Sequence, residues 1–291
     1  SWIDPRSGEI INASVTVYHN IVQLVQYWRF LQTAPADKDV RDIVLPEDLL
    51  GDCIAYVLSH EVGHTLSLMH NMAGSSSIPV ESLRDPKFTQ EYGTTYSIMD
   101  YARNNYVAQP GDKEKGVRMT PPELGAYDYY AISWLYKPIF EAKTAEEEIP
   151  VLDKWISEKS GDPKYRYGKQ QFKRRFDPSS VEEDLGDDPV KASEYGRRNL
   201  QYILKHMNEW VADKDKDFEF RSALYDEIVY GYVRYLTFVL ADIGGIYLNE
   251  RYDGDQRQSY QTVPKARQKK ALNFLFNELK DLSWLDAREA L

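Results

Sequence analysis

The amino-acid sequence predicts an α+β fold, in which a part with a small sheet and one prominent helix precedes a mostly helical part. Apolar and polar residues alternate near the N-terminus, as in a half-buried strand. Elsewhere apolar residues recur every three or four positions, as on one face of a helix. After about residue 140 the composition changes to charged stretches and long helical patterns. We therefore expect two domains, residues 1–145 and residues 146–291.

The first half is predicted to contain one strand and two helices. The strand covers residues 10–17 and is followed by a helix over residues 20–32, where apolar side chains recur at helical spacing. A second helix starts at Pro46, which precedes two acidic residues in a favourable first turn, and runs towards His70. The segment Asn71–Tyr96 is rich in Gly, Ser and Pro and is predicted to be mostly loop.

The second half is predicted to be almost wholly helical. Charged residues dominate the stretches Glu141–Glu148 and Lys154–Asp188. Three long helices are expected over Val190–Val211, Phe218–Ile243 and Lys265–Leu279, and the glycine pair after the middle one should end it.

The composition excludes several classes of function. With 36 Lys+Arg against 46 Asp+Glu, the net charge of −10 argues against nucleic-acid binding and against docking on an anionic membrane. No segment is apolar enough to span a membrane, and the N-terminus does not resemble a signal peptide. The single cysteine, Cys53, excludes an internal disulfide framework and is interpreted as a buried small apolar residue. The oligomeric state is left open.

One short motif carries most of the chemistry. His60, Glu61 and His64 form H-E-x-x-H. On a helix the two histidines lie on the same face and can hold one metal ion between them, while the glutamate lies beside them. Two histidines on an exposed helix face would be an alternative for this motif alone.

A third histidine makes that alternative improbable. His70 follows His64 by six residues and cannot lie on the same helical face, so the helix must end near Ser67 for the chain to turn back. Three of the five histidines would then surround one metal. Three imidazoles and a water are the ligands of catalytic zinc, and Glu61 would take a proton from that water as general base.

The stretch His60–His70 resembles the metzincin zinc peptidases, whose motif is H-E-x-x-H-x-x-G-x-x-H. Metzincins also carry a methionine-containing turn beneath the metal, and residues 97–101, Ser-Ile-Met-Asp-Tyr, are similar to it. The resemblance implies a structural role for Met99 below the histidines. It also implies that Tyr101 lies at or near the zinc and stabilises negative charge on the substrate oxygen.

The resemblance extends along nearly the whole chain. Residues 4–10, 101–112 and 183–188 are similar to a bacterial family of large, exported zinc-dependent Met-zincin proteins whose function is poorly defined. The family implies that residues 1–145 are a metzincin-like catalytic part and that the chain is the C-terminal portion of a longer precursor. It also implies a location outside the cytoplasm.

The strand predicted over residues 10–17 has two interpretations. In metzincins a strand at the edge of the cleft pairs with an extended substrate peptide. A plain core strand is the slightly favoured alternative.

One position departs from the metzincin pattern. Ser67 occupies the place of the motif glycine, where the helix exit needs a left-handed backbone conformation. A serine there would cost about 1–2 kcal/mol, which metal binding could offset. This substitution raises the question of whether activity is lowered.

The acidic residues 182–184, 187 and 188 suggest calcium, but they lack the ligand spacing of an EF-hand, so a solvated loop or helix cap is favoured. Zinc is the one expected cofactor. The leading hypothesis is a zinc peptidase, specifically an endopeptidase, acting on a peptide or protein substrate. The alternatives are a zinc-stabilised binding module with little or no activity, and a zinc hydrolase of non-peptide amides or esters.

Overall fold

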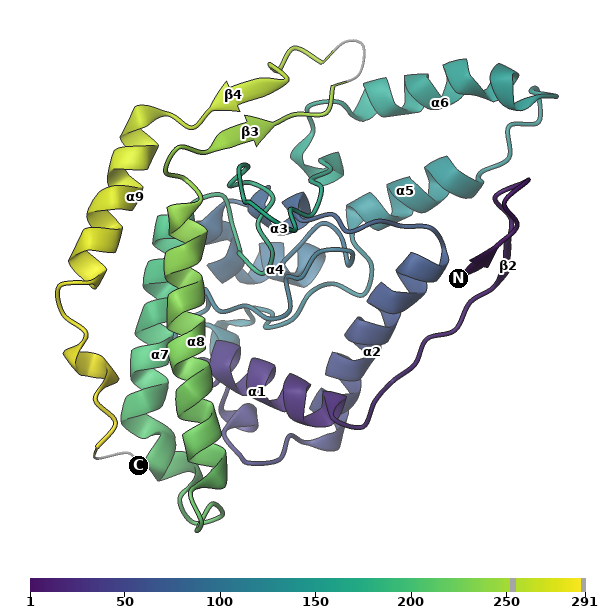
Figure 1. The fold of residues 1–291 in the computed structure, drawn as a ribbon. Coiled ribbons are helices and arrows are strands. Elements are labelled where there is room, and N and C mark those ends of the chain that lie inside the picture. The colour runs from purple at the N-terminus through teal and green to yellow at the C-terminus, as the bar shows by residue number, and fades with distance from the viewer. Residues whose placement is uncertain (252–254, 289–291) are drawn as a thin grey trace.

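The computed structural model describes residues 1–251 and 255–288. Helices dominate the described chain, and its strands form two small antiparallel sheets of two strands each (Figure 1). The prediction of an α+β fold with a mostly helical second half is confirmed. None of the helices in the described ranges is both long and apolar enough to cross a membrane.

The N-terminal strand is shorter and more exposed than predicted. Strand β1 (Trp2–Ile3) pairs with β2 (Ile10–Asn12), and the chain then continues as an irregular segment. Val15 and Val17 are 38% and 47% exposed, so the expectation of a half-buried core strand up to residue 17 is wrong. The apolar alternation is present, but no layer of the described structure covers it, because the segment passes along the outside of the molecule (Figure 1).

The two helices predicted in the first half are confirmed as α1 (Ile21–Thr33) and α2 (Glu47–Thr65). They pack against one another, and α1 also packs against two helices of the second half. Phe30 of α1 is completely buried in that contact. The single turn of 3₁₀ helix η1 (Lys38–Val40) lies between α1 and α2.

The segment after His70 is more ordered than expected. It contains the short helices α3 (Ala73–Ser76), η2 (Val80–Arg84) and α4 (Pro86–Tyr92), so the prediction of mostly loop was wrong. Asp85 caps α4 by accepting a hydrogen bond from Phe88 N. Such short helices are stabilised by caps and tertiary contacts, and they are too short to show apolar residues recurring at helical spacing.

Three further elements lead from the first half to the second. They are η3 (Lys113–Lys115), α5 (Ala126–Tyr136) and α6 (Ala145–Lys159), followed by the turn η4 (Pro163–Tyr165). Figure 1 shows α5 and α6 on the same side of the molecule as the N-terminal strands, and Trp134 of α5 donates a hydrogen bond to the Leu152 carbonyl of α6 at 3.4 Å.

The long helices of the second half are confirmed within a few residues as α7 (Pro189–Val211), α8 (Glu219–Leu240) and α9 (Lys265–Glu278). Helices α7 and α8 form a long pair, and α9 packs against both (Figure 1). Strands β3 (Ile246–Leu248) and β4 (Tyr260–Thr262), which were not predicted, form a hairpin between α8 and α9, and η5 (Ser283–Leu285) follows α9.

The main hydrophobic core joins residues of both halves of the chain. It is built mainly on the inner faces of α1, α7 and α8, and its completely buried residues include Phe30, Leu200, Ile203, Leu224 and Ile228. The division into domains at residue 145 stays a prediction, but this core shows that the first half packs directly on the helices of the second.

The acidic residues at positions 182, 183 and 188 are engaged in ion pairs or in a helix cap. Glu182 pairs with Arg175, and Glu183 with Arg103 at 2.7 Å. Asp188 caps α7 by accepting a hydrogen bond from the Lys191 backbone. These contacts agree with the favoured interpretation as a loop and helix cap, and nothing in them supports calcium.

Candidate metal centre

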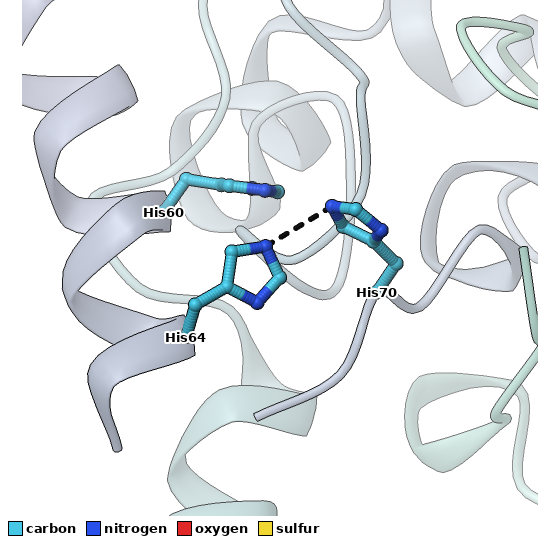
Figure 2. Close-up of side chains that lie close together, drawn as sticks. All are labelled: His60, His64 and His70. Atoms are coloured by element: carbon cyan, nitrogen blue, oxygen red, sulfur yellow. Dashed lines mark hydrogen bonds between the residues drawn. The ribbon is translucent and has the colours of Figure 1, made fainter. Parts of the chain in front are cut away.

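The three histidines of the motif lie together, as the sequence predicts. His60 and His64 lie on adjacent turns of α2, and His70 approaches from the chain beyond the helix (Figure 2). One ligand atom from each lies within 4.8 Å of the others. The Nε2 atoms of His64 and His70 are 3.1 Å apart. Within residues 1–251 and 255–288 this is the only group of three or more His, Cys, Asp or Glu placed to hold a metal ion.

The other nitrogen of each ring has a fixed acceptor. His60 Nδ1 lies 2.6 Å from the Ile98 carbonyl oxygen, and His64 Nδ1 lies 2.9 Å from the Leu68 carbonyl oxygen. His70 Nδ1 lies 2.6 Å from Oε1 of Gln170. Because all three partners are oxygen acceptors, each Nδ1 carries the proton and donates.

This tautomer leaves a lone pair on every Nε2 atom. Lone pairs of His64 and His70 that face one another at 3.1 Å repel unless a cation lies between them. A tetrahedral zinc with Zn–N distances of 2.0–2.1 Å separates its nitrogen ligands by about 3.3 Å. The His64–His70 spacing therefore suits a zinc ion, and a ligand atom of His60 lies within 4.8 Å of both, so the three residues can hold one metal. Their bonded Nδ1 atoms are the usual support of zinc ligands.

Burial also keeps the imidazoles in the form that binds metal. Removal from water lowers the pKa of His60 to about 4 and lowers the pKa of His70 as well. Neutral imidazole is the ligand form, so both rings are ready to bind at neutral pH.

The turn between the second and third histidines is a helix end with Ser67 in the left-handed conformation. Helix α2 ends at Thr65, and the amides of Ser67 and Leu68 donate to the carbonyls of His64 and Gly63, both at 3.1 Å. These two bonds form a Schellman motif, whose left-handed position is usually glycine. Ser67 has φ of 67° there. The prediction that the helix ends near Ser67 is confirmed, together with the conformation expected at this residue.

Met99 lies completely buried against the same helix. A Cβ atom on Gly63 would come within 2.4 Å of Met99 Sδ, so the glycine lets the methionine approach the helix backbone. Asp128 of α5 holds the turn that carries Met99, because its carboxylate accepts from Ser97 Oγ at 2.7 Å and from Ile98 N at 2.9 Å. The carbonyl of Ile98 that supports His60 is fixed by these contacts.

Tyr101 points its hydroxyl at the histidines. The phenol oxygen lies 2.9 Å from His70 Nε2, and the side chain is half-buried. Burial raises the pKa of Tyr101, so its proton is retained at neutral pH and is available for donation.

Glu61 is exposed and faces a groove of about 450 Å³. Glu61 and His64 line one side of this groove, and residues 14–18 of the irregular N-terminal segment line the other. A larger cavity of about 770 Å³ contacts Ser67 and Met69 but contains neither Glu61 nor any of the three histidines. The groove beside Glu61 thus reaches the metal centre at His64.

Sequence reasoning missed Gln170, the acceptor of the third histidine. It lies 100 residues after His70 in a charge-rich stretch that carries no periodic pattern. Asp128 was also missed, because its contact with Ser97 joins two segments that are 31 residues apart. Cys53, interpreted as buried, is only half-buried.

A family model described as Met-zincin matches residues 42–291. The chain belongs to the Met-zincin family. No match was found among curated proteins or among solved structures. The family and the three-histidine site together indicate a zinc metalloprotease.

Proposed function

We propose that this Met-zincin protein is a zinc-dependent endopeptidase in which His60, His64 and His70 hold the metal and Glu61 is the general base. The observation that carries the proposal is the convergence of three imidazole lone pairs beside an exposed glutamate in an open groove. The donor set matches catalytic zinc, which takes three protein ligands and leaves one position open.

Zinc, when bound, would lower the pKa of water and polarise the carbonyl of the substrate. Glu61 takes the proton of the attacking water and passes it to the leaving amine. Tyr101 donates a hydrogen bond to the negative charge that develops on the carbonyl oxygen. Its hydroxyl lies close enough to His70, at 2.9 Å, to reach the same space. Met99 is a structural support below the histidines, as in the methionine turn of metzincins.

The groove offers a place for an extended peptide. Residues 13–17 have no backbone hydrogen bond to any part of the chain that the structure describes. Free N–H and C=O groups next to Glu61 and His64 could pair with a substrate backbone as an added strand. Such pairing gives affinity without strong sequence selection, which suits a peptidase with a broad range of substrates.

The family resemblance supports a location outside the cytoplasm, where this protein would meet its substrates. The single cysteine agrees with a chain that works without disulfides.

A library of peptides from a digested proteome tests the proposal. The wild-type protein and Glu61→Ala are each loaded with zinc and incubated with the library, and new termini are identified by mass spectrometry. We expect cleavage within peptides by the wild type and almost none by the variant. Equal cleavage by both proteins, or none by either, would count against the proposal.

Ser67 favours a second candidate, a zinc-stabilised binding module with little turnover. Its left-handed backbone at a glycine position stores strain next to the third ligand. This candidate predicts that a chelator lowers the melting temperature while the zinc-loaded wild type cleaves nothing in the library.

A further inference from the structure

The third histidine is supported in a different way from the other two. His60 and His64 belong to a helix, and their Nδ1 atoms donate to backbone carbonyls. His70 lies beyond the helix, and its Nδ1 donates to a side chain, Gln170 Oε1, at 2.6 Å. The ring least restrained by its own backbone is thus held by a residue from the second half of the chain.

Gln170 is itself held in place by contacts with the residues that follow His70. Met72 N donates to the Gly168 carbonyl at 2.8 Å, and Gly168 N donates to Asn71 Oδ1 at 2.9 Å. Asn71 is completely buried and also donates through Nδ2 to the Arg166 carbonyl at 2.9 Å. The segment before Gln170 is therefore bonded directly to the chain that carries His70.

Close packing and a second bonded residue restrict the segment further. A Cβ atom on Gly168 would lie 2.5 Å from Ala73 Cβ, so the two backbones approach as closely as glycine permits. On the other side, Ser180 Oγ donates to the Lys169 carbonyl at 2.8 Å. These contacts fix the backbone immediately before Gln170, whose side chain is half-buried.

We propose that Gln170 is a positioning residue for the metal centre: its amide oxygen accepts a hydrogen bond from the Nδ1–H of His70, which directs the Nε2 lone pair of that ring at the metal. An acceptor on Nδ1 fixes both the tautomer and the ring orientation of a histidine ligand. The second half of the chain thereby completes the metal site. This inference rests on the proposed zinc site but not on peptide hydrolysis.

Zinc affinity of four full-length proteins tests the inference: the wild type, Gln170→Leu, Gln170→Glu and Lys169→Ala. Leucine removes the acceptor at similar volume, and glutamate keeps an acceptor oxygen. Lys169→Ala is the control, because this neighbouring side chain is exposed. Affinity is measured by competition with a zinc chelator of known strength, and the melting temperature of each metal-free protein is recorded alongside.

We expect Gln170→Leu to bind zinc about 10–100-fold more weakly, which is the usual effect of losing such an acceptor. Gln170→Glu should restore wild-type affinity or exceed it, and Lys169→Ala should match the wild type. The metal-free melting temperatures of Gln170→Leu and Gln170→Glu should agree, so that the difference in affinity does not reflect unfolding.

Unchanged affinity in Gln170→Leu would overturn the inference, as would equal losses in Gln170→Leu and Gln170→Glu. A wild type that binds no zinc would instead overturn the proposed function, and the inference with it. The two failures are therefore distinguishable.

Discussion

Met99 Sδ lies only 2.4 Å from the position that a Cβ atom on Gly63 would take. The methionine therefore packs against the bare backbone of the metal-site helix. Met99 is completely buried and shares a cluster with Leu68, so a shift of its side chain would disturb the packing beside the turn between the second and third histidines. The contact explains why a glycine precedes His64.

Gly63→Ala should therefore destabilise the protein by about 1–3 kcal/mol through overpacking, and should also weaken zinc binding. Denaturant unfolding and zinc titration measure the two effects. Gly51→Ala on the same helix is the matched control, since nothing lies within 4 Å of its added methyl group. That control should gain about 0.5–1 kcal/mol, because alanine favours a helix over glycine. A Gly63→Ala protein as stable as Gly51→Ala would show that the close contact is wrong.

Ser67→Gly should stabilise the protein. The left-handed conformation costs a serine about 1–2 kcal/mol, which glycine avoids. Glycine also increases the conformational entropy of the unfolded chain, which reduces this gain in stability by about 0.4–1 kcal/mol. We expect a net gain of up to about 1.6 kcal/mol in the free energy of unfolding. Ser67→Ala is the control, because alanine has the same conformational penalty and should give no gain. Stabilisation by alanine equal to that by glycine would point to the side chain rather than to the φ of 67°.

Asp184→Asn should stabilise the protein at neutral and alkaline pH. Asp184 is buried, and its Oδ1 has no hydrogen-bond partner among the residues that the structure describes. Burial, with Asp100 and Glu182 nearby, raises the pKa of Asp184 well above its ordinary value. A carboxyl whose pKa is raised on folding contributes stability at low pH and loses it as the pH rises. The variant's advantage in melting temperature should therefore be larger at pH 8 than at pH 4.5.

Asp215→Asn is the opposite case. Asp215 is also buried, and burial raises its pKa. Hydrogen bonds from Arg221 and from two backbone amides lower the pKa by more than burial raises it, so the pKa of Asp215 lies below its ordinary value. Asparagine at this position should destabilise the protein at pH 8, and the loss should shrink as the pH falls through the range in which the carboxyl takes up a proton. Matching pH trends for the two variants would contradict the assignment of Asp184 as an unpaired carboxyl.

Tyr101→Phe should lower kcat by about 10²–10³-fold, because it removes one hydrogen-bond donor to the developing negative charge. KM and zinc content should change little, because the proposed metal ligands are the three histidines. Steady-state kinetics on a cleaved peptide and metal analysis measure these quantities. Tyr129→Phe, on an exposed tyrosine of α5, is the control and should leave kcat unchanged. A loss of zinc in Tyr101→Phe would indicate a ligand rather than a hydrogen-bond donor.

Local sequence patterns predicted the parts of this fold that local physics determines. Helices α1, α2, α7, α8 and α9 have apolar residues at helical spacing, and the meeting of His60 with His64 follows from the geometry of one helix. The end of α2 was predictable because the third histidine requires it. Helix α6 also has a sequence signal at its start: Thr144 and Glu147 have the T-x-x-E spacing of a capping box, and Thr144 accepts a hydrogen bond from Glu147 N.

Contacts between distant segments could not be predicted from one sequence. Gln170 reaches His70 across 100 residues, and the short helix α3 depends on Asp100, whose carboxylate accepts from Ser75 N at 2.7 Å. The residues after β2 alternate as a strand would, yet they remain exposed because burial depends on what the rest of the chain places against them. Tertiary contacts decide these features, and a local pattern does not contain them.

The central claim is that Glu61 acts as the base at a zinc centre held by three histidines. Its most direct test is the cleavage rate of one peptide by the wild type and by Glu61→Gln at equal, measured zinc content. Glu47→Gln serves as the control, because Glu47 is an exposed carboxylate at the far end of the same helix. We predict one zinc per chain in all three proteins and a rate about 10²–10⁴-fold lower in Glu61→Gln alone. A Glu61→Gln protein that binds zinc and cleaves the peptide as fast as the wild type would contradict the claim.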